Sequence, residues 1–153
     1  DRISLNNHWS IIHGDLCFSN MFYDRRKNQI KLIDPRGSFG QDGIEGDPLY
    51  DLVKLSHSIH GNYDYFACDL YTLEEKENEY LLNIASPKRE LLSRKILGNL
   101  LTRQVNKLGI DFRELRLLES TLFLSAAALH TENDRGKALF LHGLQIAKEN
   151  LLE

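Results

Sequence analysis

The sequence lacks the features that place a protein in a disulfide-rich, metal-stapled or low-complexity class. It has two cysteines, Cys17 and Cys68, among 153 residues, and they form no CxxC pair. Two such cysteines build neither a disulfide framework nor a structural zinc site, so a reducing cytoplasm is the expected location. Ten glycines and three prolines are too few for a collagen-like or disordered chain.

Long apolar runs and an excess of charge of one sign are also missing. The least polar stretch, residues 122–129, is far shorter than the roughly 20 residues of a membrane-spanning helix. Nineteen basic and 22 acidic residues leave a net charge of −3, unlike the basic surface of a protein that binds nucleic acid or a membrane surface. We therefore expect neither a nucleic acid nor a membrane as a partner.

What remains is an ordinary globular composition, with 42% hydrophobic and 27% charged residues. This length and composition fit one domain over 1–153. We expect a small β part over 1–46 and a mainly helical part over 47–153, which together make an α+β fold. The sequence opens on Asp1 rather than Met, and we expect it to be a piece of a longer protein.

The first third of the sequence predicts short strands. Apolar runs at 9–12 and 21–23 are followed by an alternating segment at 29–33, with only polar residues between the last two. This arrangement predicts a β-hairpin with its turn at 24–28. A similar pattern within 62–86 predicts a short helix or loop and then a second hairpin.

The remaining segments predict helices. Asp47 and Pro48 are a strong helix start, and Gly61 is a suitable stop. Three further helices follow residue 86, and the second, which is apolar nearly all round, is expected at the centre of a bundle. The apolar faces predicted for the first and third are Leu92, Ile96, Leu97, Leu100, Leu101, Val105 and Leu108, and then Phe140, Leu144, Ala147 and Leu151.

Three polar residues beside the first hairpin point to a metal site. Asp15 and Asn20 lie five residues apart in one loop, and Asp34 follows the returning strand. The hairpin would bring Asp34 back beside Asn20, and carboxylate and amide oxygens are ligands that suit Mg²⁺. Each residue alone is more often a turn or cap residue, but the three together favour a site.

His13-Gly14-Asp15, Asn20 and Asp34 together resemble the catalytic loop and metal-binding aspartate of the aminoglycoside phosphotransferase and choline kinase families. These are small-molecule kinases with a protein-kinase-like fold. The spacing matches the H-R-D-x-x-x-x-N pattern of protein kinases, with Gly14 in place of Arg.

The resemblance extends over residues 8–60 and is weaker beyond them. The GDPLYDLVKL segment, residues 46–55, resembles the helix that follows the metal-binding aspartate in these families. The IDPRG and GDPLYDL segments are most similar to the corresponding segments of bacterial members linked to capsular and other cell-surface polysaccharide biosynthesis. Residues 62–153 match only as the helical part of a kinase-like C-terminal lobe.

The resemblance implies a role for each residue of the motif. Asp15 is implied as the catalytic base and His13 as a brace of the catalytic loop; a positioned base contributes about 10²–10⁴ in rate. Asn20 and Asp34 are implied as Mg²⁺ ligands that hold the metal against the phosphates of ATP. Asp51 is implied as the buried aspartate that accepts backbone N–H groups from the catalytic loop.

Arg36 departs from the Asp-Phe-Gly pattern of protein kinases. Two interpretations stay open for it. Its guanidinium could contact a nucleotide phosphate or the substrate, or it could pair with an acid of the glycine-containing loop that follows.

One part of a kinase is missing from this sequence. There is no G-x-G-x-x-G and no Walker A pattern, and only 12 residues precede His13. We expect an N-terminal lobe to be encoded upstream, although a stand-alone remnant is the alternative, and we expect this chain alone to be inactive. The expected function is ATP-dependent phosphorylation of a hydroxyl on a sugar, amino sugar or amino alcohol. The alternatives are a non-catalytic kinase-like scaffold and a metal-dependent hydrolase.

Overall fold

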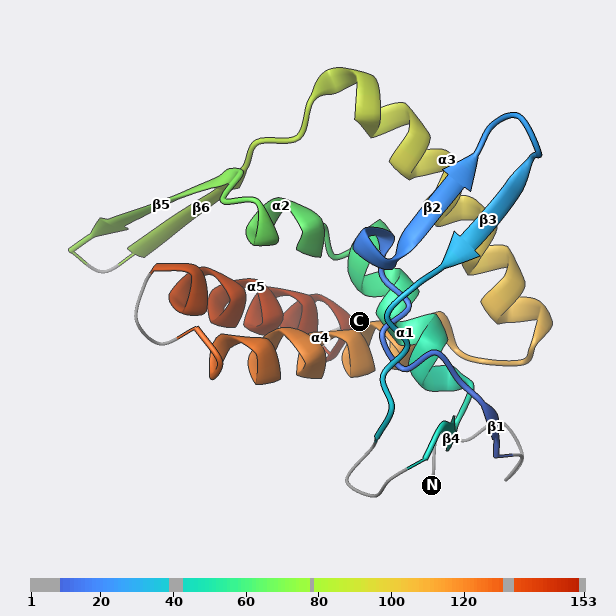
Figure 1. Ribbon diagram of the computed structural model, residues 1–153. Coiled ribbons are helices and arrows are strands. Elements are labelled where there is room, and N and C mark those ends of the chain that lie inside the picture. The colour runs from blue at the N-terminus through green and yellow to red at the C-terminus, as the bar shows by residue number, and fades with distance from the viewer. Residues whose placement is uncertain (1–8, 39–42, 78, 131–133, 152–153) are drawn as a thin grey trace.

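The computed structural model describes residues 9–38, 43–77, 79–130 and 134–151. Over these ranges the fold is α+β and mainly helical, and every strand belongs to a two-stranded sheet (Figure 1). The predicted fold class is therefore confirmed at this level. Parts of the predicted β segment, residues 1–8 and 39–42, lie outside the described ranges.

Two small antiparallel sheets form the N-terminal part. Strand β1 (Ser10–Ile11) pairs with β4 (Glu45–Gly46), and β2 (Met21–Asp24) pairs with β3 (Gln29–Leu32). The second pair confirms the first predicted hairpin. Between β1 and β2 the chain forms a loop that ends in one turn of 3₁₀ helix, η1 (Phe18–Asn20).

Helix α1 (Leu49–Ile59) begins and ends where the sequence predicts. The Asp47 carboxylate accepts a hydrogen bond from the Leu49 N–H at 2.9 Å, which satisfies one of the free donors of the first turn. Gly61 follows the helix but does not adopt the left-handed conformation that usually explains a glycine there. A Cβ at Gly61 would lie 2.5 Å from Glu119 Oε1 and 2.6 Å from Phe123 Cε2, so this glycine is required by close packing.

The middle of the chain contains a short helix and a second hairpin. Helix α2 (Tyr63–Ala67) precedes strands β5 (Tyr71–Lys76) and β6 (Glu79–Ile84), which pair antiparallel. The predicted second hairpin is confirmed. It projects away from the helices at one end of the molecule (Figure 1).

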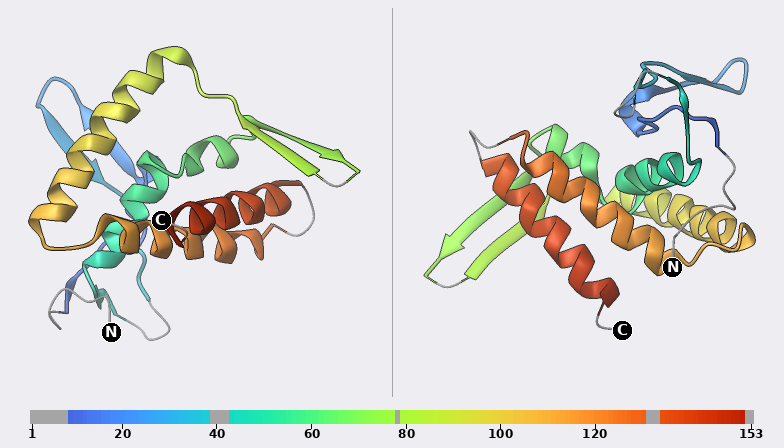
Figure 2. Two further views of the ribbon diagram at one scale, coloured as in Figure 1. Left: turned by 180° about the vertical axis from the view of Figure 1, so that it is seen from behind. Right: turned by 90° about the horizontal axis from the view of Figure 1, so that it is seen from below.

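Three long helices complete the fold: α3 (Lys88–Lys107), α4 (Phe112–Ala127) and α5 (Asp134–Leu151). Gly109, with φ of +75°, ends α3, and the Asp111 side chain caps α4 by accepting from the Arg113 N–H. Helices α4 and α5 lie side by side, α1 packs on α4, and the β2–β3 hairpin lies on the opposite side of α1 from α4 (Figure 2). Helix α4 thus lies between α1 and α5, but Thr121 and Ser125 on its outer face and Leu129 just beyond it are exposed, so its predicted burial is only partly confirmed.

The predicted apolar faces of α3 and α5 are only partly confirmed. On α3, Leu101 and Val105 are buried, but the other predicted positions are exposed. On α5 the predicted face is wrong, because Phe140 and Leu144 are exposed while Leu139 and Ile146 are buried. The remaining exposed residues of the two predicted faces are Leu92, Ile96, Leu97, Leu100, Leu108 and Leu151.

Glycine explains the face that α5 presents to α4. A Cβ at Gly143 would lie 3.0 Å from Phe123 Cβ and 3.1 Å from Ser120 O, so the two helices approach closely at this point. Gly136 and Gly143 therefore lie on the buried face with Leu139 and Ile146. A count of apolar side chains does not register such a face, because its glycines have no side chain.

Several polar groups are buried where α1 meets α4. Glu119 of α4 accepts a hydrogen bond from Ser56 of α1 and pairs with Arg116, and burial raises the pKa of its carboxyl. His57 is stacked on Tyr63 and packed against the edge of Phe123, with ring centroids 4.3 and 4.1 Å away. Burial lowers the pKa of His57 well below its ordinary value.

No helix among the described residues combines the length and the apolar character needed to cross a membrane.

We predict that Gly61→Ala destabilises the fold by about 1–3 kcal/mol, because a methyl group there overpacks the contact with Glu119 and Phe123. Urea unfolding measures the change. Gly37→Ala is the matched control, since a Cβ at Gly37 meets no atom within 4 Å. Equal stability of the two variants would contradict the packing role assigned to Gly61.

We also predict that the buried histidines make the fold sensitive to acid. Burial lowers the pKa of His57 and His142, and it lowers that of His60 from 6.5 to about 4. Between these two pH values the unfolded chain binds protons that the folded chain does not, so these groups reduce the free energy of unfolding as the pH falls.

The comparison of wild type with His57→Phe isolates this effect. A comparison of two proteins is needed because burial raises the pKa of Glu119 and Asp64. Those acids therefore increase the free energy of unfolding as the pH falls, which opposes the effect of the histidines. We expect the variant, which keeps the stacked ring, to lose less stability than the wild type between pH 7 and pH 5 in urea unfolding. A variant that loses as much or more would disprove the assignment to His57.

Candidate active site

The loop that follows β1 is held by one carboxylate of α1. Asp51 accepts hydrogen bonds from the backbone N–H groups of His13 and Gly14, each at 2.7 Å and each through its own oxygen. Gly14 has φ of +76°, a conformation that favours glycine. Both backbone donors of this turn are therefore fixed to the first turn of a helix, as the resemblance implies for Asp51, although Asp51 is half-buried rather than buried.

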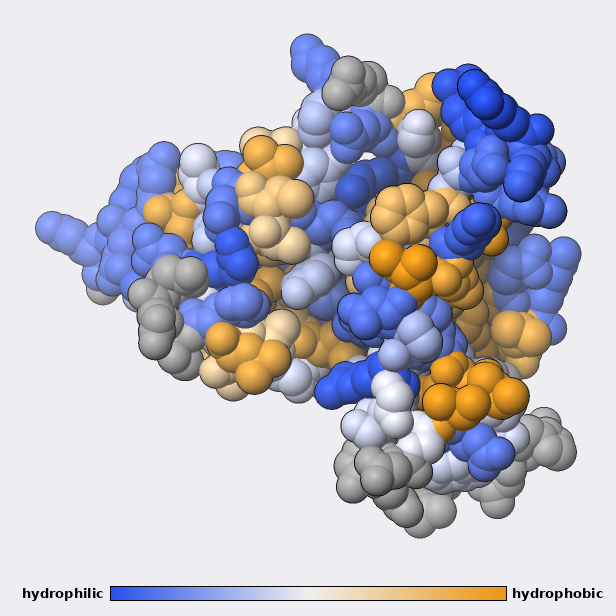
Figure 3. All heavy atoms as spheres, in the orientation of Figure 1, coloured by the Kyte–Doolittle hydropathy of each residue, from blue (hydrophilic) through white to orange (hydrophobic). Residues whose placement is uncertain are grey.

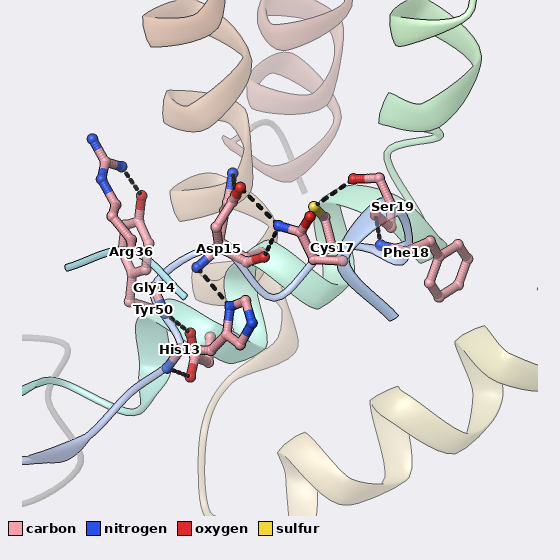
Figure 4. A network of polar contacts seen from close by, with 12 residues as sticks. His13, Gly14, Asp15, Cys17, Phe18, Ser19, Arg36 and Tyr50 are labelled. Atoms are coloured by element: carbon pink, nitrogen blue, oxygen red, sulfur yellow. Dashed lines mark hydrogen bonds and ion pairs between the residues drawn. The ribbon is translucent and has the colours of Figure 1, made fainter. Parts of the chain in front are cut away.

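The His13 side chain connects this loop to the end of β3. Its Nε2 lies 2.9 Å from the Ile33 carbonyl oxygen, and its Nδ1 lies 3.3 Å from the Asp15 backbone nitrogen. A carbonyl only accepts and a backbone N–H only donates, so Nε2 carries the proton and Nδ1 accepts. His13 thus connects the two segments of the site, and its contact with the Asp15 nitrogen is visible in Figure 4.

Asn20 is oriented by Asp15. Its Nδ2 donates to the Asp15 carbonyl oxygen at 2.9 Å and to Asp15 Oδ2 at 3.0 Å. Because both partners are acceptors, the amide nitrogen must face them. The Oδ1 of this buried side chain is the end left to accept or to ligate.

Asp34 lies in a segment that is pinned at both ends. Its neighbour Ile33 donates a backbone hydrogen bond to the Asn20 carbonyl at 3.0 Å, and Arg36 donates one to the His13 carbonyl at 2.8 Å. Asp34 itself has φ of +54°, so the chain turns sharply at this residue. The hairpin therefore returns to Asn20, as the sequence predicts.

The acids meet in a cavity of about 230 Å³, which is lined by Asp15, Asp34, Pro35 and Arg36. The Arg36 guanidinium lies 3.4 Å from the Tyr50 hydroxyl at one side of this group (Figure 4). The structure thus brings Asp15, Asp34 and Arg36 to one cavity, with Asp51 bound to the loop before Asp15 and Asn20 hydrogen-bonded to Asp15.

Lys54 belongs to the site but was not identified from the sequence. Its Nζ lies 2.6 Å from Asp15 Oδ1, and its side chain is 14% exposed. Lys54 and Ser58 follow Asp51 at helical spacing, so all three lie on one face of α1. Ser58 Oγ accepts from the Phe18 N–H at 3.1 Å, and an i, i+3, i+7 polar stripe is the signal that could have identified Lys54.

The donor set fits Mg²⁺ better than a softer metal. Among the described residues no group of three His, Cys, Asp or Glu side chains could hold a metal ion. Mg²⁺, however, takes one or two protein oxygens and completes its shell with water and phosphate. The Asp34 carboxylate and the Asn20 Oδ1 can supply those oxygens.

The charges of the site suit a polyanion that arrives with a cation. Two carboxylates, Asp15 and Asp34, lie with two cations, Lys54 and Arg36, so the formal charges of these four side chains cancel. Preorganised cations and metal-binding oxygens stabilise the negative charge of a transferring phosphoryl group. A carboxylate beside them can accept a proton.

No family model, curated protein or solved structure matches the chain.

We predict that Asp51→Asn lowers the free energy of unfolding by about 1.5–3 kcal/mol, because an amide offers one acceptor where two backbone donors need partners. Asp111→Asn is the matched control, since asparagine caps a helix as well as aspartate. Chemical denaturation of both variants checks this, and a loss at position 51 no larger than at position 111 would contradict the anchoring role.

Proposed function

We propose that this chain is the C-terminal lobe of an ATP- and Mg²⁺-dependent phosphotransferase that phosphorylates a hydroxyl of a small molecule. The observation that carries the proposal is that Asp15 and Asp34, from two separate segments, line one cavity, with the Asn20 amide hydrogen-bonded to Asp15. The spacing of these residues matches the kinase pattern H-x-D-x-x-x-x-N.

In this proposal each residue has one task. Mg²⁺, when bound, neutralises charge on the β- and γ-phosphates and orients them. Asn20 Oδ1 and the Asp34 carboxylate hold the metal, and the Arg36 guanidinium contacts the phosphates. Asp51 and His13 keep the loop in place and do not touch the substrate.

The reaction itself is a direct transfer. The acceptor oxygen forms a bond to the γ-phosphorus while the bond between this phosphorus and the oxygen that bridges it to the β-phosphate breaks, and ADP leaves. The hydroxyl proton goes to the Asp15 carboxylate. Since phosphoryl transfer needs little covalent assistance, positioning and charge supply most of the rate enhancement.

An N-terminal lobe from a longer protein completes the proposed enzyme. Trp9, Ile11, Phe22, Ile30 and Ile44 of the β part are exposed, and Figure 3 shows apolar patches on this side of the molecule. Apolar side chains that lie together at a surface are typical of an interaction face. We propose that the lobe covers part of this exposed apolar surface.

The acceptor class and location are also part of the proposal. The resemblance favours a sugar, amino sugar or amino alcohol, including precursors of capsular polysaccharide. Both thiols are unpaired, with Cys17 buried and Cys68 exposed. Free thiols and a requirement for ATP favour a cytoplasmic enzyme.

We predict that Asp15→Ala and Asp34→Ala each reduce ATP-dependent phosphorylation at least about 100-fold in the intact protein, because each removes a group that acts in the transition state. Transfer from Mg²⁺ and γ-labelled ATP to glucose, glucosamine and choline is measured, and Glu74→Ala on the exposed β5 strand is the control. Circular dichroism verifies that the variants fold.

The products separate the alternatives. Labelled acceptor supports a kinase, whereas labelled free phosphate alone, formed equally with and without acceptor, supports a hydrolase. Turnover close to wild type in Asp15→Ala or Asp34→Ala would remove the assignment. The absence of both products in the wild type would favour a scaffold.

A further inference from the structure

Lys54 is the charged group of the site that the kinase pattern leaves without a task. It lies on α1 one turn after Asp51, and its ammonium contacts Asp15 Oδ1 at 2.6 Å. Its side chain is 14% exposed, whereas that of Asp15 is 37% exposed. The cation therefore lies beneath the carboxylate, and the carboxylate lies at the cavity.

The surroundings of Lys54 indicate more than a surface ion pair. The charge of Lys54 acts to lower the pKa of both Tyr63 of α2 and His57 of α1. Burial is the larger influence on each: it raises the pKa of Tyr63 and lowers that of His57. Neither group is an anion near neutral pH, so Asp15 is the carboxylate that compensates Lys54 among the described residues. A long side chain held in this way has lost most of its freedom before any ligand binds.

The hydrogen-bond capacity of this pair is only partly used. Asp15 Oδ1 forms an ion pair with the Lys54 ammonium, and Asp15 Oδ2 accepts a hydrogen bond from the Asn20 amide at 3.0 Å. The ammonium of Lys54 has three N–H donors, and the contact with Asp15 uses one of them. The other donors can serve an oxygen that enters the cavity beside Asp15.

We propose that Lys54 is a second catalytic residue of this site, whose ammonium bridges the Asp15 carboxylate and an oxygen of the transferring phosphoryl group. The inference rests on the proposed phosphotransferase function and names a residue that the kinase pattern does not contain. The ammonium orients the Asp15 carboxylate, and it neutralises charge that develops on the phosphoryl oxygens.

The test compares three variants of the intact protein. Lys54→Met keeps the length of the side chain and removes the charge, Lys54→Arg keeps the charge, and Lys148→Met on the exposed surface of α5 is the matched control. Rates of transfer from Mg²⁺-ATP are measured to an acceptor and, because water needs no identified acceptor, to water.

We expect Lys54→Met to lower kcat about 10²–10³-fold, with a much smaller change in the KM for ATP, because the contact is made chiefly in the transition state. Lys54→Arg, which keeps the charge, should retain more of the wild-type kcat than Lys54→Met, and Lys148→Met should behave as wild type.

A purely structural lysine gives a different result. If Lys54→Met keeps kcat within about threefold, or loses activity only in proportion to the folded protein that remains, the inference is wrong. Lys54→Gln provides the same test if Lys54→Met does not fold. An inactive wild type would overturn the proposed function itself, whereas an active wild type with an indifferent Lys54→Met overturns this inference alone.

Discussion

The site depends on the carboxylate of Asp51. Its two oxygens bind the consecutive N–H groups of His13 and Gly14 at 2.7 Å, and charge-assisted hydrogen bonds of this kind are the stronger class. With the turn fixed, the His13 ring donates a hydrogen bond to the Ile33 carbonyl, and the His13 carbonyl accepts one from the Arg36 backbone N–H. The position of Asp34 relative to Asp15 is therefore set by α1, which binds the loop at the two residues that directly precede Asp15.

Helix α1 combines two tasks on two faces. The face toward the loop carries Asp51, Lys54 and Ser58. The other face carries Leu49, Val53 and Ser56, which are buried, and Ser56 donates a hydrogen bond to Glu119 of α4. The polar face can hold the loop accurately because the other face is anchored in the helical core. This division places a small and largely exposed β part on a stable support, and it is the arrangement that a positioning-dependent reaction such as phosphoryl transfer requires.

The sequence predicted the elements whose causes are local. The β2–β3 hairpin follows from its polar turn, and the start of α1 follows from Asp47 and Pro48, because neighbouring residues supply the partners. The buried face of α5 and the role of Lys54 depend on contacts with distant segments. The buried face of α5 includes Gly136 and Gly143, which a search for apolar side chains does not find. The contact of Lys54 with Asp15 forms only when the loop is folded against α1.

The central claim is that Asn20 and Asp34 bind the metal of a nucleotide beside Asp15. A crystal structure of the intact protein with Mg²⁺ and a non-hydrolysable ATP analogue tests it most directly. The account predicts metal–oxygen distances of about 2.0–2.1 Å to Asn20 Oδ1 and an Asp34 carboxylate oxygen, with the γ-phosphate facing Asp15. A nucleotide bound with its metal away from both residues would contradict it.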